Sequence, residues 1–176
     1  MIEVIKNILP QEINKKIIQT LIHTKNWAMA SDDEQAQKKL VEDLLGPPGK
    51  DNGFYLQTYN LLQGIDLPSP LNIYADIVYT LIKNNTKYKF LRPERFYWNY
   101  YNNSSHCLMH KDKLDDHYVS FVYNLHTSNG GTEIEGTFYK SNCGEAIVFP
   151  SNFLHKAITP TDTKSRFSLN CIVNLI

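Results

Sequence analysis

The chain has 176 residues, of which 42% are hydrophobic and 20% are charged, and this is an ordinary globular composition. Lys and Arg together number 18, as do Asp and Glu, so the formal net charge is zero. Because phosphate binding requires a basic surface, this balance argues against a protein built mainly to bind nucleic acid, although a local basic groove stays open. The length suits a single domain, which we expect to span residues 1–176.

The start of the chain mixes charged residues into its apolar positions, so we expect no secretory signal. No run of about 18 apolar residues occurs, and no transmembrane helix is expected. The three cysteines, Cys107, Cys143 and Cys171, are widely spaced and form no CxxC pair. Such a set is typical of free thiols in a reducing compartment, and these features together predict a cytoplasmic protein.

The first half of the chain shows mainly helical spacing. Ile13, Ile17 and Leu21 recur at intervals that place them on one helix face, and Pro70 suits the first turn of a later helix. The GPPG sequence at residues 46–49 ends a more polar helix. No element is assigned to residues 50–69. The expected elements are a short strand within 2–9 and helices over 11–24, 33–45 and 70–84.

From about residue 87 the pattern changes to the alternation of apolar and polar residues that is typical of strands. Gly130-Gly131 and the triplet Asn142-Cys143-Gly144 are turn signals. Several short strands at regular spacing favour a sandwich or barrel. We therefore expect an α+β fold, with a helical part over about 1–86 that covers one face of a β-structure over about 87–176. The strands are expected over residues 88–91, 94–102, 118–126, 132–138, 145–149, 154–158 and 166–175.

The triplet His110-Lys111-Asp112 is a candidate metal-binding pair. In an extended strand, side chains two residues apart point to the same face, so His110 and Asp112 can offer one nitrogen and one oxygen to a single metal. Such triplets also occur by chance, and this one lies in the polar run HKDKLDDH. Taken alone, the triplet is therefore better explained as a surface His and Asp.

Other potential ligands lie close to this triplet. His106 and His110 have the spacing of a helical zinc pair, but the Glu that follows the first His in zinc proteases is missing. Asp115, Asp116 and His117 are better explained as a solvated turn before the strand over 118–126. We therefore favour His110 and Asp112 over these neighbours.

His155, Arg166 and Ser168 lie further along the chain, on apolar segments. A strand, a turn and a second strand over residues 144–158 would place His155 in the interior, where a structural role explains it equally well alone. Arg166, Ser168 and Asn170 share one face of the last predicted strand, which meets either solvent or a cavity. A guanidinium with a nearby hydroxyl matches a carboxylate.

These pieces gain weight from their combination and order. Two imidazoles and one carboxylate can hold one face of an octahedral Fe(II) and leave the other positions open. A cationic Arg with a hydroxyl partner can then hold the far carboxylate of a dicarboxylate co-substrate. The triplet, the distal His155 and the Arg166-x-Ser168 pair occur in this order within the strand-rich half.

The second half of the chain resembles the 2-oxoglutarate/Fe(II)-dependent oxygenase superfamily, and within it the prolyl 4-hydroxylase-like branch. The resemblance covers roughly residues 94–175. It departs from the branch at residues 102–105, where a Gly is often found, at Thr132, which replaces an acidic residue, and at Arg166, where classical prolyl 4-hydroxylases use Lys. The matching pieces are Tyr101, His110-Lys111-Asp112, Gly130-Gly131, GEAIVFPSNFLH at 144–155 and RFSLN at 166–170.

The resemblance implies a double-stranded β-helix, or jelly roll, with the N-terminal helices packed on one sheet. The implied cofactors are Fe(II), 2-oxoglutarate and O2, with ascorbate as a reductant. The implied activity is that of a dioxygenase that hydroxylates an unactivated C–H bond and releases succinate and CO2. The implied iron ligands are His110, Asp112 and His155, and the implied co-substrate contacts are Arg166, Ser168 and Tyr101.

The resemblance leaves the substrate open. A prolyl or other residue of a peptide or protein is the first expectation, and a small molecule is an alternative. Phe121, Phe149 and Leu169 are candidates for an apolar lining of the reaction site. An AlkB-like nucleobase oxygenase would carry a second Arg after Arg166, and residues 169–173 contain none. A non-catalytic jelly-roll module and a cupin-like metal enzyme without 2-oxoglutarate also remain as alternatives.

Overall fold

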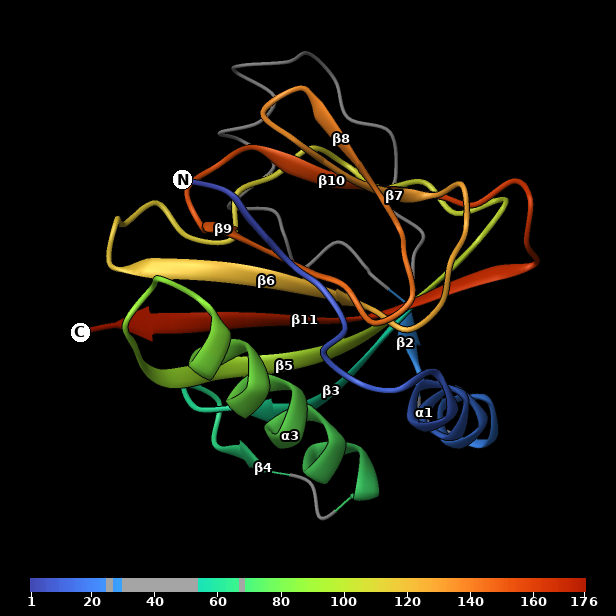
Figure 1. The fold of residues 1–176 in the computed structure, drawn as a ribbon, viewed down its shortest axis with the longest axis horizontal. Coiled ribbons are helices and arrows are strands. Elements are labelled where there is room, and N and C mark those ends of the chain that lie inside the picture. The colour runs from blue at the N-terminus through green and yellow to red at the C-terminus, as the bar shows by residue number, and fades with distance from the viewer. Residues whose placement is uncertain (25–26, 30–53, 67–68) are drawn as a thin grey trace.

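The structure, a computed structural model, describes residues 1–24, 27–29, 54–66 and 69–176. The helix expected over 33–45 lies outside these residues. Figure 1 shows three layers: the helices cover one face of a large sheet, and a small sheet lies over its other face. The described helices and strands are β1 (Glu3–Ile5), α1 (Gln11–His23), β2 (Ala28–Met29), β3 (Phe54–Asn60), β4 (Ile65–Asp66), α3 (Pro70–Asn85), β5 (Phe90–Asn102), β6 (Tyr118–Asn124), β7 (Gly131–Ile134), β8 (Thr137–Lys140), β9 (Ala146–Pro150), β10 (His155–Ile158) and β11 (Ser165–Leu175).

The large sheet has eight strands, in the order β1-β9-β6-β11-β5-β3-β2 with β4 paired to β3, and the small sheet has the order β10-β7-β8. Every pairing in both sheets is antiparallel. The expected α+β jelly roll is confirmed. Strands β1 to β4 also join this sheet, so the first half of the chain contributes more strand than its pattern indicated.

Both described helices form where the spacing predicted them. In α3 the Ser69 hydroxyl accepts a hydrogen bond from the Leu71 backbone N–H at 3.2 Å, and Pro70 occupies the first turn. Ile17 of α1 and Val78 of α3 are fully buried in the core between the helices and the large sheet. Neither of these two helices is long and apolar enough to cross a membrane.

The central strands of the large sheet present different chemistry on their two faces, because successive side chains point to opposite sides. Phe121 of β6 and Leu169 of β11 pack in the core beneath the helices. Val122, Ile134 and Phe149 form a smaller core between the two sheets. Phe149 therefore lies on the inner face of the large sheet, which we define as the face toward the small sheet. Phe121 and Leu169 lie on the opposite face, so the expectation that they line the reaction site was wrong.

The strand expected over 132–138 is in fact a hairpin, in which β7 and β8 are joined by Glu135 and Gly136. Both residues have positive φ, 47° and 75°, as a two-residue hairpin turn of this type requires. The Glu135 carboxylate accepts a hydrogen bond from the Leu154 backbone N–H at 2.6 Å, and this supports the unusual backbone at a non-glycine residue. Only glycine fits at position 131, the first residue of β7, because a Cβ there would lie 2.1 Å from the Tyr139 carbonyl oxygen.

Two further strand boundaries differ from expectation. The strands expected over 88–91 and 94–102 are one long strand, β5, that pairs with β11 along its whole length. The irregularities in this pairing fall between Ile172 and Val173 and between Asn174 and Leu175. Pro93 lies beside the first of these irregularities, where Glu94 is an extra residue of β5 without a partner in β11.

Candidate metal and co-substrate site

Two segments that are distant in the sequence are held together by backbone hydrogen bonds. His110 and His155 form an isolated antiparallel bridge, with N–H to carbonyl distances of 2.9 Å in both directions. The backbone N–H groups of Asp112 and Lys113 both donate to the Ser151 carbonyl, at 3.0 and 3.1 Å. The loop that carries the His-x-Asp triplet is therefore fixed against the turn that leads into β10.

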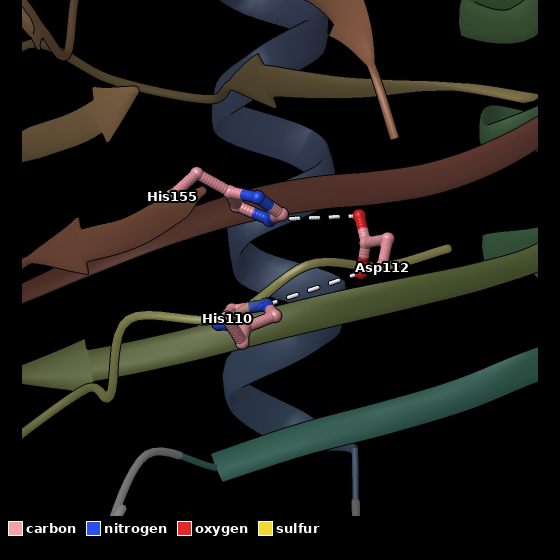
Figure 2. A group of neighbouring side chains, drawn as sticks. All are labelled: His110, Asp112 and His155. Carbon is pink, nitrogen blue, oxygen red and sulfur yellow. Dashed lines mark ion pairs between the residues drawn. The ribbon is translucent and has the colours of Figure 1, made fainter. Parts of the chain in front are cut away.

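This arrangement brings the three predicted ligands to one point. Figure 2 shows the side chains of His110, Asp112 and His155 directed toward one another. Their ligand atoms all lie within 4.8 Å of one another. His155 Nε2 is 3.5 Å from one Asp112 oxygen, and His110 Nε2 is 3.9 Å from the other. Two imidazoles and one carboxylate facing a common point suit a divalent transition metal.

The orientation of the two imidazoles fits a metal at that point. His110 Nδ1 lies 3.0 Å from the Leu108 carbonyl, and His155 Nδ1 lies 3.0 Å from the Phe153 carbonyl. Because a carbonyl only accepts, each Nδ1 carries the proton and each Nε2 presents its lone pair. His155 Nε2 is buried and has no hydrogen-bond partner. A bound metal would satisfy this atom, so the residues fit the group.

Asp112 is held as a carboxylate by a network of donors. Arg95 Nη2 donates to one oxygen at 2.7 Å, and the Ser120 hydroxyl donates to the other at 2.5 Å. Ser120 also lies 2.8 Å from the buried Ser151 hydroxyl. Burial alone would raise the pKa of Asp112, but Arg95, the two imidazoles and Ser120 outweigh burial and hold this pKa well below its usual range. The group is therefore ionised and ready to bind a cation.

His155 is kept neutral by its surroundings. Burial, and after it the neighbouring His110, lower the pKa of His155 from 6.5 to about 4, against the opposing effect of Asp112. The ring of Phe149 lies 4.8 Å from that of His155 in an edge-on arrangement. A neutral imidazole is the form that binds metals, so His155 is available as a ligand at neutral pH.

Arg166 is a fully buried guanidinium on the same inner face of the large sheet. Its Nη2 donates to Asn124 Oδ1 at 3.0 Å and to the Thr132 hydroxyl at 3.3 Å, and its Nε has no partner. Among the residues that the structure describes, no carboxylate forms an ion pair with it. Burial lowers the pKa of Arg166. A buried cation without a counter-ion is costly and indicates that an anion binds here.

The other two predicted co-substrate contacts lie beside Arg166. Tyr101 is its cross-strand neighbour on β5, and the guanidinium carbon lies 5.7 Å from the centre of the tyrosine ring. Ser168 is buried two residues further along β11, and the alternation of the strand puts it on the same face as Arg166. The face of the last strand that carries Arg166 and Ser168, for which the sequence left solvent or a cavity open, is therefore buried.

Several residues of the site were missed in the sequence. Arg95, Ser120, Asn124 and Thr132 each contact Asp112 or Arg166. The first three are polar residues that alternate with apolar ones on β5 and β6, and this pattern marks a face that is not ordinary core. Thr132 had been noted as a departure from the family pattern, and in the structure its hydroxyl accepts from Arg166.

Comparison with known proteins supports the same fold. No protein-family model and no curated protein matches the chain. A Pseudomonas putida prolyl 4-hydroxylase has a TM-score of 0.67 at 13% identity, over 99% of this chain and 92% of the other. A Trichoplax adhaerens prolyl hydroxylase, in complex with a hypoxia-inducible factor peptide fragment, has a TM-score of 0.67 at 13% identity, over 98% and 83%. The epimerase SnoN, in complex with Fe3+, 2-oxoglutarate and nogalamycin RO, has a TM-score of 0.64 at 9% identity, over 98% and 78%.

The chain therefore has the jelly-roll fold of the prolyl 4-hydroxylases and other 2-oxoglutarate/Fe(II)-dependent oxygenases. This confirms the fold that the sequence resemblance implied. Because function on a shared fold depends on the residues of the site, the activity of this chain has to be argued from its own side chains.

Proposed function

We propose that this chain is a 2-oxoglutarate- and Fe(II)-dependent dioxygenase that hydroxylates an unactivated C–H bond. His110, Asp112 and His155 would hold the iron, and Arg166 with Ser168 and Tyr101 would hold 2-oxoglutarate. The proposed substrate is a prolyl or other residue of a peptide or protein, or a small molecule. The Trichoplax adhaerens prolyl hydroxylase, in complex with a peptide fragment, supports the peptide, and SnoN, in complex with nogalamycin RO, supports the small molecule.

The observation that carries this proposal is the buried Arg166 on the same sheet face as the three ligands. Burying a guanidinium without a carboxylate partner costs free energy, and a metal enzyme without an anionic co-substrate would gain nothing to offset that cost. The Arg166 guanidinium instead matches the distal carboxylate of a dicarboxylate in a two-point contact. Asn124 and Thr132 would keep its plane in position while it binds.

The chain's residues would perform the following tasks. Iron bound with 2-oxoglutarate supplies the activation of O2 that yields succinate, CO2 and the hydroxylated product. Asp112 stays ionised through Arg95 and Ser120, so the ligand charge is constant across the neutral pH range. The backbone bridge between His110 and His155 fixes the spacing of the two imidazoles. The inner-face core around Phe149 excludes water from one side of the triad.

The test is an anaerobic titration with Fe(II) and then 2-oxoglutarate, followed by visible absorbance. Keto-acid chelation at Fe(II) gives a weak charge-transfer band, and we expect this band to saturate at one 2-oxoglutarate per chain. If the metal binds but no such band appears, the protein binds a metal and does not bind 2-oxoglutarate at that metal. The cupin-like and non-catalytic alternatives would then replace the proposal.

A further inference from the structure

The three proposed ligands differ sharply in their exposure. The Asp112 and His155 side chains are 1% and 4% exposed, but the His110 side chain is 31% exposed. The Arg95 side chain, which is hydrogen-bonded to Asp112, is 25% exposed. Solvent therefore reaches the triad on the side of His110 and Arg95, and a substrate that approaches the metal from solvent would meet these two side chains.

Arg95 is held on the inner face of the large sheet by aromatic rings. Its guanidinium carbon lies 4.3 Å from the centre of the Tyr97 ring. Tyr97 in turn stacks on Tyr55 of β3, with ring centres 5.1 Å apart and planes 28° apart. Such a stack reduces the freedom of the guanidinium and leaves its edge available for hydrogen bonding.

The hydrogen-bonding capacity of Arg95 is mostly unused. A guanidinium has five N–H donors, and the structure pairs Nη2 of Arg95 with Asp112. Nε is buried and has no partner. Among the described residues, the Arg95 guanidinium donates a hydrogen bond to Asp112 alone. Arg95 therefore retains donors for a further acceptor while it holds Asp112.

The charge balance at this point changes when the site is filled. Without metal, Arg95 and Asp112 neutralise each other. A divalent metal at Asp112 adds two positive charges, and the chelating carboxylate of 2-oxoglutarate removes one, while Arg166 is matched by the distal carboxylate. One positive charge then remains beside Arg95. A singly charged anion would neutralise it, and a cationic group would be repelled.

We propose that Arg95 binds a carboxylate of the substrate, so that the substrate is an acid. This rests on the proposed function, since it names the substrate class of the same site. Two sources carry such a carboxylate: a free small acid, and the C-terminus of a peptide. The bidentate geometry of a guanidinium favours a carboxylate over a neutral amide of the same shape.

The experiment measures binding without turnover. The full chain is loaded with Mn(II) in place of Fe(II) and with 2-oxoglutarate, and ligand binding is followed by the relaxation of ligand protons. The probes are matched acid and amide pairs: phenylacetate with phenylacetamide, N-acetyl-L-proline with N-acetyl-L-prolinamide, and a proline-ended tripeptide with its C-terminal amide. Preference for the small acids or for the tripeptide distinguishes the two sources.

We expect the acid of at least one pair to bind roughly tenfold or more tightly than its amide, since hydrogen bonds to charged groups are worth about that much. Arg95→Gln should reduce the preference to about twofold or less. Arg92→Gln is the matched control, because Arg92 is an exposed residue of the same strand, and it should keep the full preference. Equal binding of acids and amides across all pairs, or an unchanged preference in Arg95→Gln, would overturn the proposal.

Arg95→Gln also removes a hydrogen bond to the proposed metal ligand Asp112, so a second pair of variants tests the acid preference without changing that hydrogen bond. Tyr97→Leu removes the ring beneath the guanidinium and should weaken the preference for acids, whereas Tyr97→Phe keeps the ring and the preference. Mn(II) affinity, measured by electron paramagnetic resonance, should stay within a few-fold in both Tyr97 variants. Failure of the proposed function is seen separately, as the missing visible band with Fe(II) and 2-oxoglutarate.

Discussion

His110 and His155 donate a backbone hydrogen bond to each other at 2.9 Å, and their rings lie 4.3 Å apart between centres. The bridge joins a loop to the start of β10, outside the regular ladders of the two sheets. Metal ligands on flexible loops would have to be ordered at the moment of binding, at an entropic cost. Here the backbone supplies that order before any metal binds.

Removing the carboxylate should abolish metal binding. Asp112→Ala takes away the charged ligand and leaves Arg95 beside two imidazoles, so that cations are repelled. We expect Mn(II) affinity to fall by more than about 100-fold, since loss of an outer-shell partner alone costs 10- to 100-fold. Electron paramagnetic resonance of free Mn(II) measures this directly. Asp115→Ala, in the exposed turn nearby, is the control and should bind as the parent does.

A crystal of the metal-free protein soaked in Mn(II) tests the same ligands by position. Anomalous density is expected between His110, Asp112 and His155. Density at His106 or His117 instead would refute the assignment of the triad. His117 lies in the exposed turn before β6, where the sequence pattern had placed it.

The metal-free protein should lose stability as the pH falls from neutral toward 4. In the folded state the pKa of His155 is about 4 instead of 6.5, because burial and His110 disfavour the charged form. The unfolded chain therefore binds more protons in this window, and stability is full above about pH 6.5 and decreases below it. Between pH 7 and pH 5 the loss is about 2 kcal/mol, at about 1.36 kcal/mol per unit. Urea denaturation in the presence of a chelator measures it.

A substitution identifies the group responsible for this pH dependence. His155→Gln removes the titrating imidazole and should flatten the stability profile between pH 7 and pH 5. His23→Gln changes an exposed histidine at the end of α1 and should leave the slope as it is. A slope that persists in His155→Gln would assign the loss to another group.

Arg166 should control co-substrate binding and leave metal binding largely unchanged. Arg166→Met keeps the length of the side chain but removes the charge and the donors to Asn124 and Thr132. We expect 2-oxoglutarate affinity to fall by about tenfold to 100-fold, as for a lost charge-assisted pair. Calorimetric titration of the Mn(II)-loaded protein measures both affinities. Lys164→Gln, which changes an exposed cation nearby, is the control.

A weaker Mn(II) affinity with unchanged 2-oxoglutarate affinity in Arg166→Met would contradict this division of roles. Circular dichroism should show the parent fold in the variant. Methionine in a buried site causes less disruption than an unpaired polar group, because it adapts its shape to the space.

The sequence was most informative where chemistry or periodicity is local. The spacing of Ile17 and Leu21 located α1, and the order of His110, Asp112, His155 and Arg166 located the candidate site. Those motifs are short and do not depend on the strand pairing around them. The ion pair of Arg95 with Asp112 is different, because β5 and the loop after it meet only in the folded protein.

The errors also have identifiable physical causes. The strand expected over 132–138 ignored the turn at Glu135 and Gly136, since a positive φ at glutamate is rare and depends on its contact with Leu154. Phe121 and Leu169 were placed in the reaction site on hydrophobicity alone, although each alternates with polar residues along its strand. Those polar residues face the site, whereas Phe121 and Leu169 pack beneath the helices.

Ser120 provides a last test, of the support behind the carboxylate. Its hydroxyl donates to Asp112 at 2.5 Å and lies 2.8 Å from the Ser151 hydroxyl, so it links the ligand to the turn before β10. Ser120→Ala leaves one Asp112 oxygen without this donor, and Mn(II) affinity should fall by roughly tenfold. Ser151→Ala acts one bond further away and should have a smaller effect. Ser104→Ala, in an exposed turn, is the control, and an equal effect of all three would mean that Ser120 does not orient the ligand.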